Sequence, residues 1–217
     1  MHALNNFISL GPHCCPRMRL DYIKNKNKNR INITETNFFD YLMVNINSIK
    51  QIFNIENIET FINRENINIY GSNDKNLYIE LKNIELKSIH DIVKDVDENN
   101  ELNINKQFIE KYIRRYNRLI ELLNNNKKIC FIYQSFISYE DYNELYNILK
   151  TKFINTEIII ISFQDFGEDK QIIEKYENLY YLNYNSMYIT KDYIYEPSMS
   201  FLNWDLIFEN MINIYNT

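Results

Sequence analysis

Residues 129–162 read ICFIYQSFISYEDYNELYNILKTKFINTEIIIIS, and this stretch decides the fold. It contains two short apolar runs, residues 129–133 and 157–162, and each predicts a strand that is buried on both faces. Residues 139–149, which lie between the runs, carry apolar side chains at helical spacing. A buried strand, a helix and a second buried strand form the repeating unit of a parallel sheet. The sequence therefore predicts an α/β fold.

The same alternation of strands and helices continues on both sides of this stretch. Further strands are predicted at residues 7–10 and 179–183, and further helices from Pro16 and over residues 38–53, 108–123, 170–177 and 201–214. Residues 67–90 alternate with a period of two around a turn at residues 71–74, which predicts a β-hairpin. Residues 24–30 and 95–101 are polar and predict exposed loops. We expect a single α/β domain over residues 1–217, with a mostly parallel sheet, helices on both faces of the sheet and a small inserted β-hairpin.

Composition limits the partners that the chain can have. Hydrophobic residues make up 45% of the 217 residues, which is enough for a core and excludes wholesale disorder. With 24 Lys and Arg against 29 Asp and Glu, the net charge is −5, and no broad basic face is available for nucleic acid. No apolar run approaches the roughly 18 residues that cross a bilayer, so we expect neither a nucleic-acid nor a membrane partner.

Cysteine usage and the N-terminus bear on the compartment. The chain has three cysteines, two of them adjacent at Cys14 and Cys15, which favours a reducing, cytoplasmic environment over a disulfide framework. The first residues lack the basic and apolar regions of a signal peptide. A zinc site is not predicted because the remaining Cys130, His2 and His90 do not form a second ligand pair, and we expect no cofactor. One alanine, three glycines and abundant Ile and Asn indicate an AT-rich genome, such as that of a parasite, a low-GC bacterium or a large DNA virus. The oligomeric state is not indicated.

Residues 9–17, SLGPHCCPR, are the most informative stretch of the chain for function. They follow the first predicted strand, and ligands of parallel sheets bind beyond the carboxyl ends of the strands. Pro16 suits the first position of a helix, so Cys14 and Cys15 are expected at the positive end of the helix dipole. That environment lowers the pKa of a thiol and makes it a nucleophile. The alternative is that both cysteines are small buried residues.

A cysteine nucleophile needs a base, and His90 is the best candidate. His90 shares the strand parity of Ile84 and Leu86, which predicts that its ring points to the buried side. Asp91 follows it, and Asp205 is another carboxylate that could orient the ring. The alternative is a histidine that is only a satisfied core residue.

Four motifs follow one another between residues 7 and 135. They are Ile-Ser-Leu-Gly at 8–11 followed by Cys14, Phe-Asp-Tyr at 39–41, His-Asp at 90–91, and Arg-Arg-Tyr-Asn-Arg at 114–118. In this order the chain resembles a family of uncharacterised proteins described as papain-like cysteine peptidases. Phe38 stands where that family has proline and Tyr41 where it has tryptophan. The resemblance implies that Cys14 is the nucleophile and His90 the base. The predicted α/β pattern differs from the helical lobe and antiparallel barrel of papain, so the motifs carry the resemblance.

The arginine cluster can be placed on its predicted helix. At about 100° per residue, Arg115 borders the apolar stripe, Arg118 lies further round, and Arg114 faces solvent within reach of Glu110. Arg115 and Arg118 could hold a phosphate or carboxylate, with Asp40 and His13 in the same pocket. Alternatively, Arg115 is tied to a structural carboxylate such as Asp40.

These residues support two main functions. The first is a cysteine-dependent hydrolase or acyl-transfer enzyme, in which Cys14 attacks an acyl carbon, His90 moves the proton and Asp91 orients His90. Its substrate would be a peptide, a glycan or a small molecule. The alternative is a binding or transferase protein for an anionic small molecule, such as a nucleotide-sugar or a phosphorylated glycan. A catalytically inactive interaction module is a third interpretation.

Overall fold

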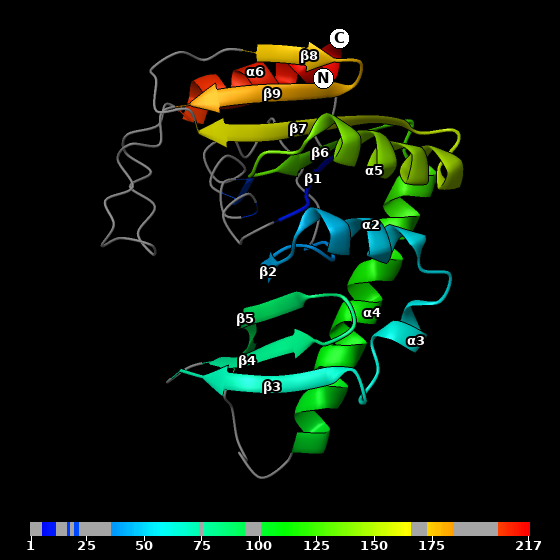
Figure 1. Ribbon diagram of the computed structural model, residues 1–217, viewed down its shortest axis with the longest axis vertical. Helices are drawn as coiled ribbons and strands as arrows, with labels where there is room; N and C mark the ends of the chain where they lie inside the picture. The colour runs from blue at the N-terminus through cyan, green and yellow to red at the C-terminus, as the bar shows by residue number, and fades with distance from the viewer. Residues whose placement is uncertain are drawn as a thin grey trace.

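The computed structural model describes residues 6–11, 17, 20–21, 36–73, 76–93, 101–165, 173–184 and 204–217. These residues form a mostly parallel sheet, an antiparallel sheet and the helices that pack on them (Figure 1). Among them, no helix is long and apolar enough to cross a membrane.

The larger sheet has five described strands in the order β1-β6-β7-β9-β8. Its strands are β1 (Phe7–Ser9), β6 (Lys128–Tyr133), β7 (Glu157–Asp165), β9 (Leu179–Tyr184) and β8 (Ile173–Tyr176). The first four run parallel, as the apolar runs predict, and β8 pairs antiparallel with β9 at the edge. The helix predicted at residues 170–177 is wrong, because residues 173–176 pair with β9 and this pairing outweighs their local helical spacing.

Two clusters of apolar side chains join the helices to this sheet. One cluster joins Ile8, Phe131 and Ile160 to residues of α2 (Ile46–Asn54), α4 (Glu101–Asn125) and α5 (Tyr139–Lys152). The other joins strand residues of opposite parity, such as Cys130 and Ile159, to α6 (Trp204–Asn216). Since successive strand residues point to opposite faces, the two clusters lie on the two faces of the sheet.

The second sheet is larger than the predicted hairpin. It has four described strands in the order β2-β5-β4-β3, namely β2 (Leu42–Met43), β5 (Leu86–Val93), β4 (Asn76–Leu81) and β3 (Ile67–Ser72). The first half of the helix predicted at residues 38–53 is wrong, because residues 38–41 form a turn and residues 42–43 pair with β5. Asn45 then caps α2 by accepting a hydrogen bond from the Ser48 N–H (2.8 Å). The short helix α3 (Ile58–Phe61) leads to β3.

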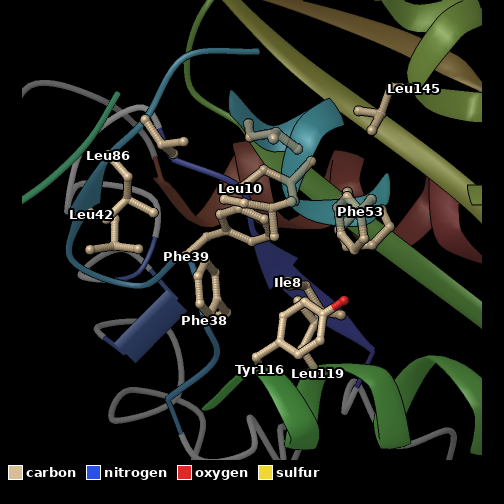
Figure 2. Close-up of a cluster of buried hydrophobic side chains, with 14 of the residues drawn as sticks. Ile8, Leu10, Phe38, Phe39, Leu42, Phe53, Leu86, Tyr116, Leu119 and Leu145 are labelled. Carbon is tan, nitrogen blue, oxygen red and sulfur yellow. The ribbon is translucent and has the colours of Figure 1, made fainter. Parts of the chain in front are cut away.

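The turn at residues 38–41 joins the two sheets. Phe38 and Phe39 are fully buried, and Figure 2 shows them among side chains that include Ile8, Leu10 and Tyr116. The Phe38 ring meets the Tyr112 and Tyr116 rings edge to face, with centroids 5.6 and 5.7 Å apart. Helix α4 extends from the antiparallel sheet to the parallel one (Figure 1). The larger apolar cluster therefore includes residues of both sheets.

Candidate functional site

The Ser-Leu-Gly motif fixes the carboxyl end of β1. The Leu10 N–H donates to the Ile132 carbonyl (2.8 Å), and the Gln134 N–H donates to the Gly11 carbonyl (3.0 Å). Gly11 has a φ of 91°, and an added Cβ would lie 2.7 Å from Val44 Cγ1. Both the conformation and the close approach require glycine. The chain leaving β1 is therefore held against the segment that follows β2.

Arg17 is the first residue described after Gly11, and it lies in a buried ion-pair network. Its side chain contacts both oxygens of Asp21, with Nη2–Oδ1 at 2.9 Å and Nε–Oδ2 at 3.0 Å. Its Nη1 lies 3.1 Å from Asp40 Oδ2. Residues 17, 20 and 21 are helical, as predicted for this segment, while Pro16 lies outside the described residues. The helix thus presents two of its side chains, Arg17 and Asp21, to the Phe-Asp-Tyr turn.

Asp40 lies at the centre of this network. It is fully buried, and its Oδ2 accepts hydrogen bonds from the Asn37 N–H (2.6 Å) and from Arg17. Its other oxygen, Oδ1, has no hydrogen-bond partner within the described part of the chain. Burial raises the pKa of Asp40 to about 6, although Arg17, the Asn37 N–H and Arg115 oppose this shift.

Tyr41 adds backbone strain next to this carboxylate. Its φ is 65°, in the left-handed region that residues with a side chain rarely adopt. Its hydroxyl donates to Asp21 Oδ2 at 3.3 Å. Uncommon backbone conformations of this kind cost about 1–3 kcal/mol and persist where the surrounding contacts hold them. The Phe-Asp-Tyr turn thus combines a buried charge and a strained residue.

Helix α4 carries the arginines of the fourth motif. Arg115 is 5% exposed, so the predicted border position is in fact buried, and its Cζ lies 5.2 Å from the centre of the Tyr112 ring. Its charge acts on Asp40 and lowers the pKa of that carboxyl. Arg118 is half-buried and donates from Nη2 to the Thr36 carbonyl (2.6 Å). Arg114 is exposed, as predicted.

His90 and Asp91 lie in β5 beside an irregularity of the sheet. Leu77 pairs with Ile92 and Ile79 with Ser88, so the single residue between Leu77 and Ile79 faces three residues, 89–91, of β5. Such a bulge interrupts the regular alternation of side chains, and the predicted orientation of the His90 ring lies outside the side chains that the structure describes. The strand itself continues to Val93.

The pairing of β2 with β5 relates His90 to Asp40. Leu42 pairs with Ser88 and Met43 with Lys87, and the two strands are antiparallel. Moving two residues from Leu42 towards the N-terminus reaches Asp40, and moving two residues from Ser88 towards the C-terminus reaches His90. The Asp40 turn and residues 89–91 therefore lie at the same end of the strand pair.

The structure relates some of the predicted site residues to one another. Asp40 and Arg115 are both buried and Arg115 acts electrostatically on Asp40, while the backbone of His90 and Asp91 lies at the same end of the β2–β5 pair as the Asp40 turn. Cys14 and His13 lie outside the described residues, between Gly11 and Arg17, which are both placed. Asp205 belongs to α6, which packs on the other face of the parallel sheet. In the part that is described, no group of three or more His, Cys, Asp or Glu side chains could hold a metal ion.

The sequence points to Arg17 only as positive charge beside the cysteines, and it gives Asp21 no role at the site. Their spacing of four residues in a predicted helix was the available signal, because such a pair lies on one helix face. The contact of Arg17 with Asp40 joins residues 23 positions apart and has no local signal.

Comparisons of the chain with protein-family models, with curated proteins and with solved structures give no match. The resemblance to papain-like cysteine peptidases rests on the four motifs.

Proposed function

We propose that the protein is a cysteine-dependent hydrolase or acyl-transfer enzyme, with Cys14 as nucleophile and His90 as base. The observation that carries this proposal is the convergence of the four motifs. Gly11 follows β1 and packs against Val44, Asp40 lies in the turn before β2, residues 90–91 lie at the bulge of β5, and Arg115 of α4 acts electrostatically on Asp40. These relations link segments separated by up to about a hundred residues, which supports a catalytic site built from them.

The chemistry follows from these residue types. His90 would take the proton from the Cys14 thiol, and the resulting thiolate would attack the acyl carbon of a peptide, glycan or small-molecule substrate. The bond to the leaving group then breaks, His90 returns the proton to that group, and an acyl-enzyme remains. Water resolves the acyl-enzyme in a hydrolase, and a second nucleophile resolves it in an acyl transferase. Cys14 precedes the helix that contains Arg17, and the positive end of that helix dipole would favour the thiolate.

The alternative function, binding or group transfer on an anionic small molecule, has less support. It needs Arg115 and Arg118 to hold the ligand, but Arg115 stacks on Tyr112 and acts on Asp40, while Arg118 donates to the Thr36 carbonyl. These contacts favour a structural role for both arginines. A thermal-shift screen with phosphate, nucleotide-sugars and carboxylates separates the two functions. Stabilisation of the wild type by one of these anions, lost in Arg115→Ala and retained in Arg114→Ala, would favour the alternative.

The reactivity of the thiols tests the proposal directly. Alkylation by iodoacetamide, followed by mass spectrometry across pH 5 to 9, should show Cys14 reacting faster at pH 6.5 than a free cysteine, whose pKa is about 8.5. Cys130 is the internal control because it is fully buried in β6 and burial raises its pKa. His90→Ala should fold and lose the enhanced rate. A Cys14 that reacts no faster than a model thiol, or whose rate is unchanged in His90→Ala, contradicts the proposal.

A further inference from the structure

We propose that Asp40 is the positioning residue that orients His90, its free Oδ1 accepting a hydrogen bond from the imidazole. This inference rests on the proposed function, since it assigns the carboxylate that holds the base. It replaces Asp91, the carboxylate that the sequence favours for this role.

The first support is the unequal use of the two Asp40 oxygens. Oδ2 accepts hydrogen bonds from the Asn37 N–H and from Arg17, whereas Oδ1 has no donor among the residues described, although the side chain is fully buried. Buried polar atoms in native proteins almost always have a partner, and exceptions call for an explanation. An imidazole N–H is a donor that would satisfy Oδ1 and would in turn be held in one orientation.

The second support is the shape of the backbone on both sides. The β2–β5 register places the Asp40 turn and His90 at the same end of the strand pair. At that end β5 carries its bulge at residues 89–91, and Tyr41 adopts a φ of 65°. Bulges next to active sites redirect side chains, and strained residues concentrate at functional sites. Two local departures from regular geometry thus occur at the end of the strand pair where the Asp40 turn and His90 lie.

Asp91 directly follows His90 in the bulge of β5, and its side chain lies outside what the structure describes. Asp40, by contrast, is fixed by Arg17 and the Asn37 N–H, so a group that it holds would be held rigidly.

The charges around Asp40 are consistent with a positioning role. Arg17, from the segment after β1, and Arg115, from α4, both stabilise its charged form, while Asp21 opposes it. Tyr41 contributes its hydroxyl to Asp21. The two arginines keep Asp40 able to ionise in spite of its burial, and only the ionised form leaves both oxygens free to accept hydrogen bonds.

NMR titration of the histidine rings tests this inference without an activity assay. The chain has three histidines, and His90→Gln identifies the His90 signal. In Asp40→Asn, an amide N–H₂ can replace Oδ1 while its carbonyl keeps the contacts of Oδ2, so the fold should be retained. Loss of the nearby negative charge should lower the pKa of His90 by about one unit. Asp21→Asn, which removes another carboxylate that contacts Arg17, is the matched control and should shift the pKa of His90 far less.

Asp91→Asn tests the alternative that Asp91, rather than Asp40, orients His90. A pKa of His90 that falls in Asp91→Asn and not in Asp40→Asn overturns the inference, and so does a value unchanged in both variants. If Asp40→Asn does not fold, the wild type still decides: a ring held by Asp40 should show one neutral tautomer in a long-range ¹H–¹⁵N spectrum, and a mixture of tautomers contradicts it.

The result for Asp40 is distinguishable from the result for the proposed function. Alkylation of Cys14 in His90→Ala tests the nucleophile and its base whatever the role of Asp40. If that rate falls but the pKa of His90 is the same in the wild type and in Asp40→Asn, the enzyme proposal stands and the positioning role fails. If the rate does not fall, the enzyme proposal fails even where Asp40 and His90 interact.

Discussion

At the scale of single residues, Gly11 is tightly constrained by its backbone conformation and by its approach to Val44. Gly11→Ala adds a Cβ 2.7 Å from Val44 Cγ1 at a φ of 91°, so both overpacking and backbone strain oppose the folded state. We expect a loss of about 2 kcal/mol or more in the free energy of unfolding, measured by urea denaturation.

Gly71→Ala is the matched control for this prediction. Its added Cβ would lie 3.0 Å from Tyr78 Cδ2, on a side chain that can shift, and Gly71 does not have a positive φ. It should cost less than about 1 kcal/mol. Equal losses in the two variants would mean that the approach of β1 to Val44 is not a tight constraint.

Asp40 should give the protein an unusual dependence of stability on pH. Its pKa is about 6 in the folded state against 3.8 for the free carboxyl, so between these values the folded protein binds more protons than the unfolded one. The stability that this group contributes is complete below pH 3.8 and is lost as the pH rises through 6. The difference between the two values, at about 1.4 kcal/mol for each pH unit, corresponds to about 3 kcal/mol.

The comparison with Asp40→Asn isolates this contribution. From about pH 4 to pH 7, the free energy of unfolding of the wild type should fall relative to that of Asp40→Asn, measured by urea titration at each pH. Other carboxylates have a lowered pKa in the folded state. Asp141, whose pKa is lowered by its hydrogen bond with Lys50, is one of them. Such groups are present in both proteins, so their contributions cancel in the difference. A difference that is constant over this range would mean that Asp40 does not titrate as its burial implies.

At the scale of secondary-structure elements, α5 begins with a defined cap. The Ser138 side chain accepts a hydrogen bond from the Asp141 N–H (3.1 Å) and donates to Asp141 Oδ2 (2.8 Å). Ser138→Ala should therefore lower the free energy of unfolding by about 1 kcal/mol, and Ser138→Gly by only a few tenths, in urea denaturation. An unchanged free energy of unfolding in Ser138→Ala would show that the side-chain cap is not what stabilises the start of α5.

The elements also show what local sequence can predict. The strands β6 and β7 and the helices α4 and α5 follow from apolar runs and from helical periodicity, because each buries its side chains in a regular pattern. Residues 38–53 mimic a helical period although only α2 is helical, because Phe38, Phe39 and Leu42 are buried by a turn and by strand pairing. Their burial depends on partners far along the chain, such as Ser88, which a local pattern does not contain.

The site follows the same rule. The motif residues Asp40 and Arg115 could be selected from the sequence, and helical geometry predicted that Arg115 lies nearer the core than Arg114. The ion pair of Arg17 with Asp40, the bulge at residues 89–91 and the positive φ of Tyr41 were not predictable. Each of these depends on the pairing of distant segments rather than on periodicity.

At the scale of the whole molecule, the shared apolar cluster should make the two sheets unfold together. Ile79 in β4 and Ile160 in β7 are both fully buried in that cluster. Ile79→Val should cost about 1 kcal/mol, and hydrogen exchange should show the same loss in the most protected amides of β7 as in those of β4. Ile160→Val is the reciprocal control. A loss confined to the sheet that carries the substitution would indicate two independently unfolding units.

The length of α4 carries a consequence for how this chain can tolerate insertions and deletions. The helix has 25 residues, with Phe108 and Tyr112 buried towards one end and Leu119 and Leu123 towards the other. Inserting one residue between Tyr112 and Arg115 would turn everything beyond it by about 100° and advance it by about 1.5 Å. Either the half beside the antiparallel sheet or the half beside the parallel sheet would then present polar side chains to the core. The helix thus fixes how the two sheets are rotated about its axis relative to each other, and we expect insertions and deletions to be tolerated only in the connections outside it.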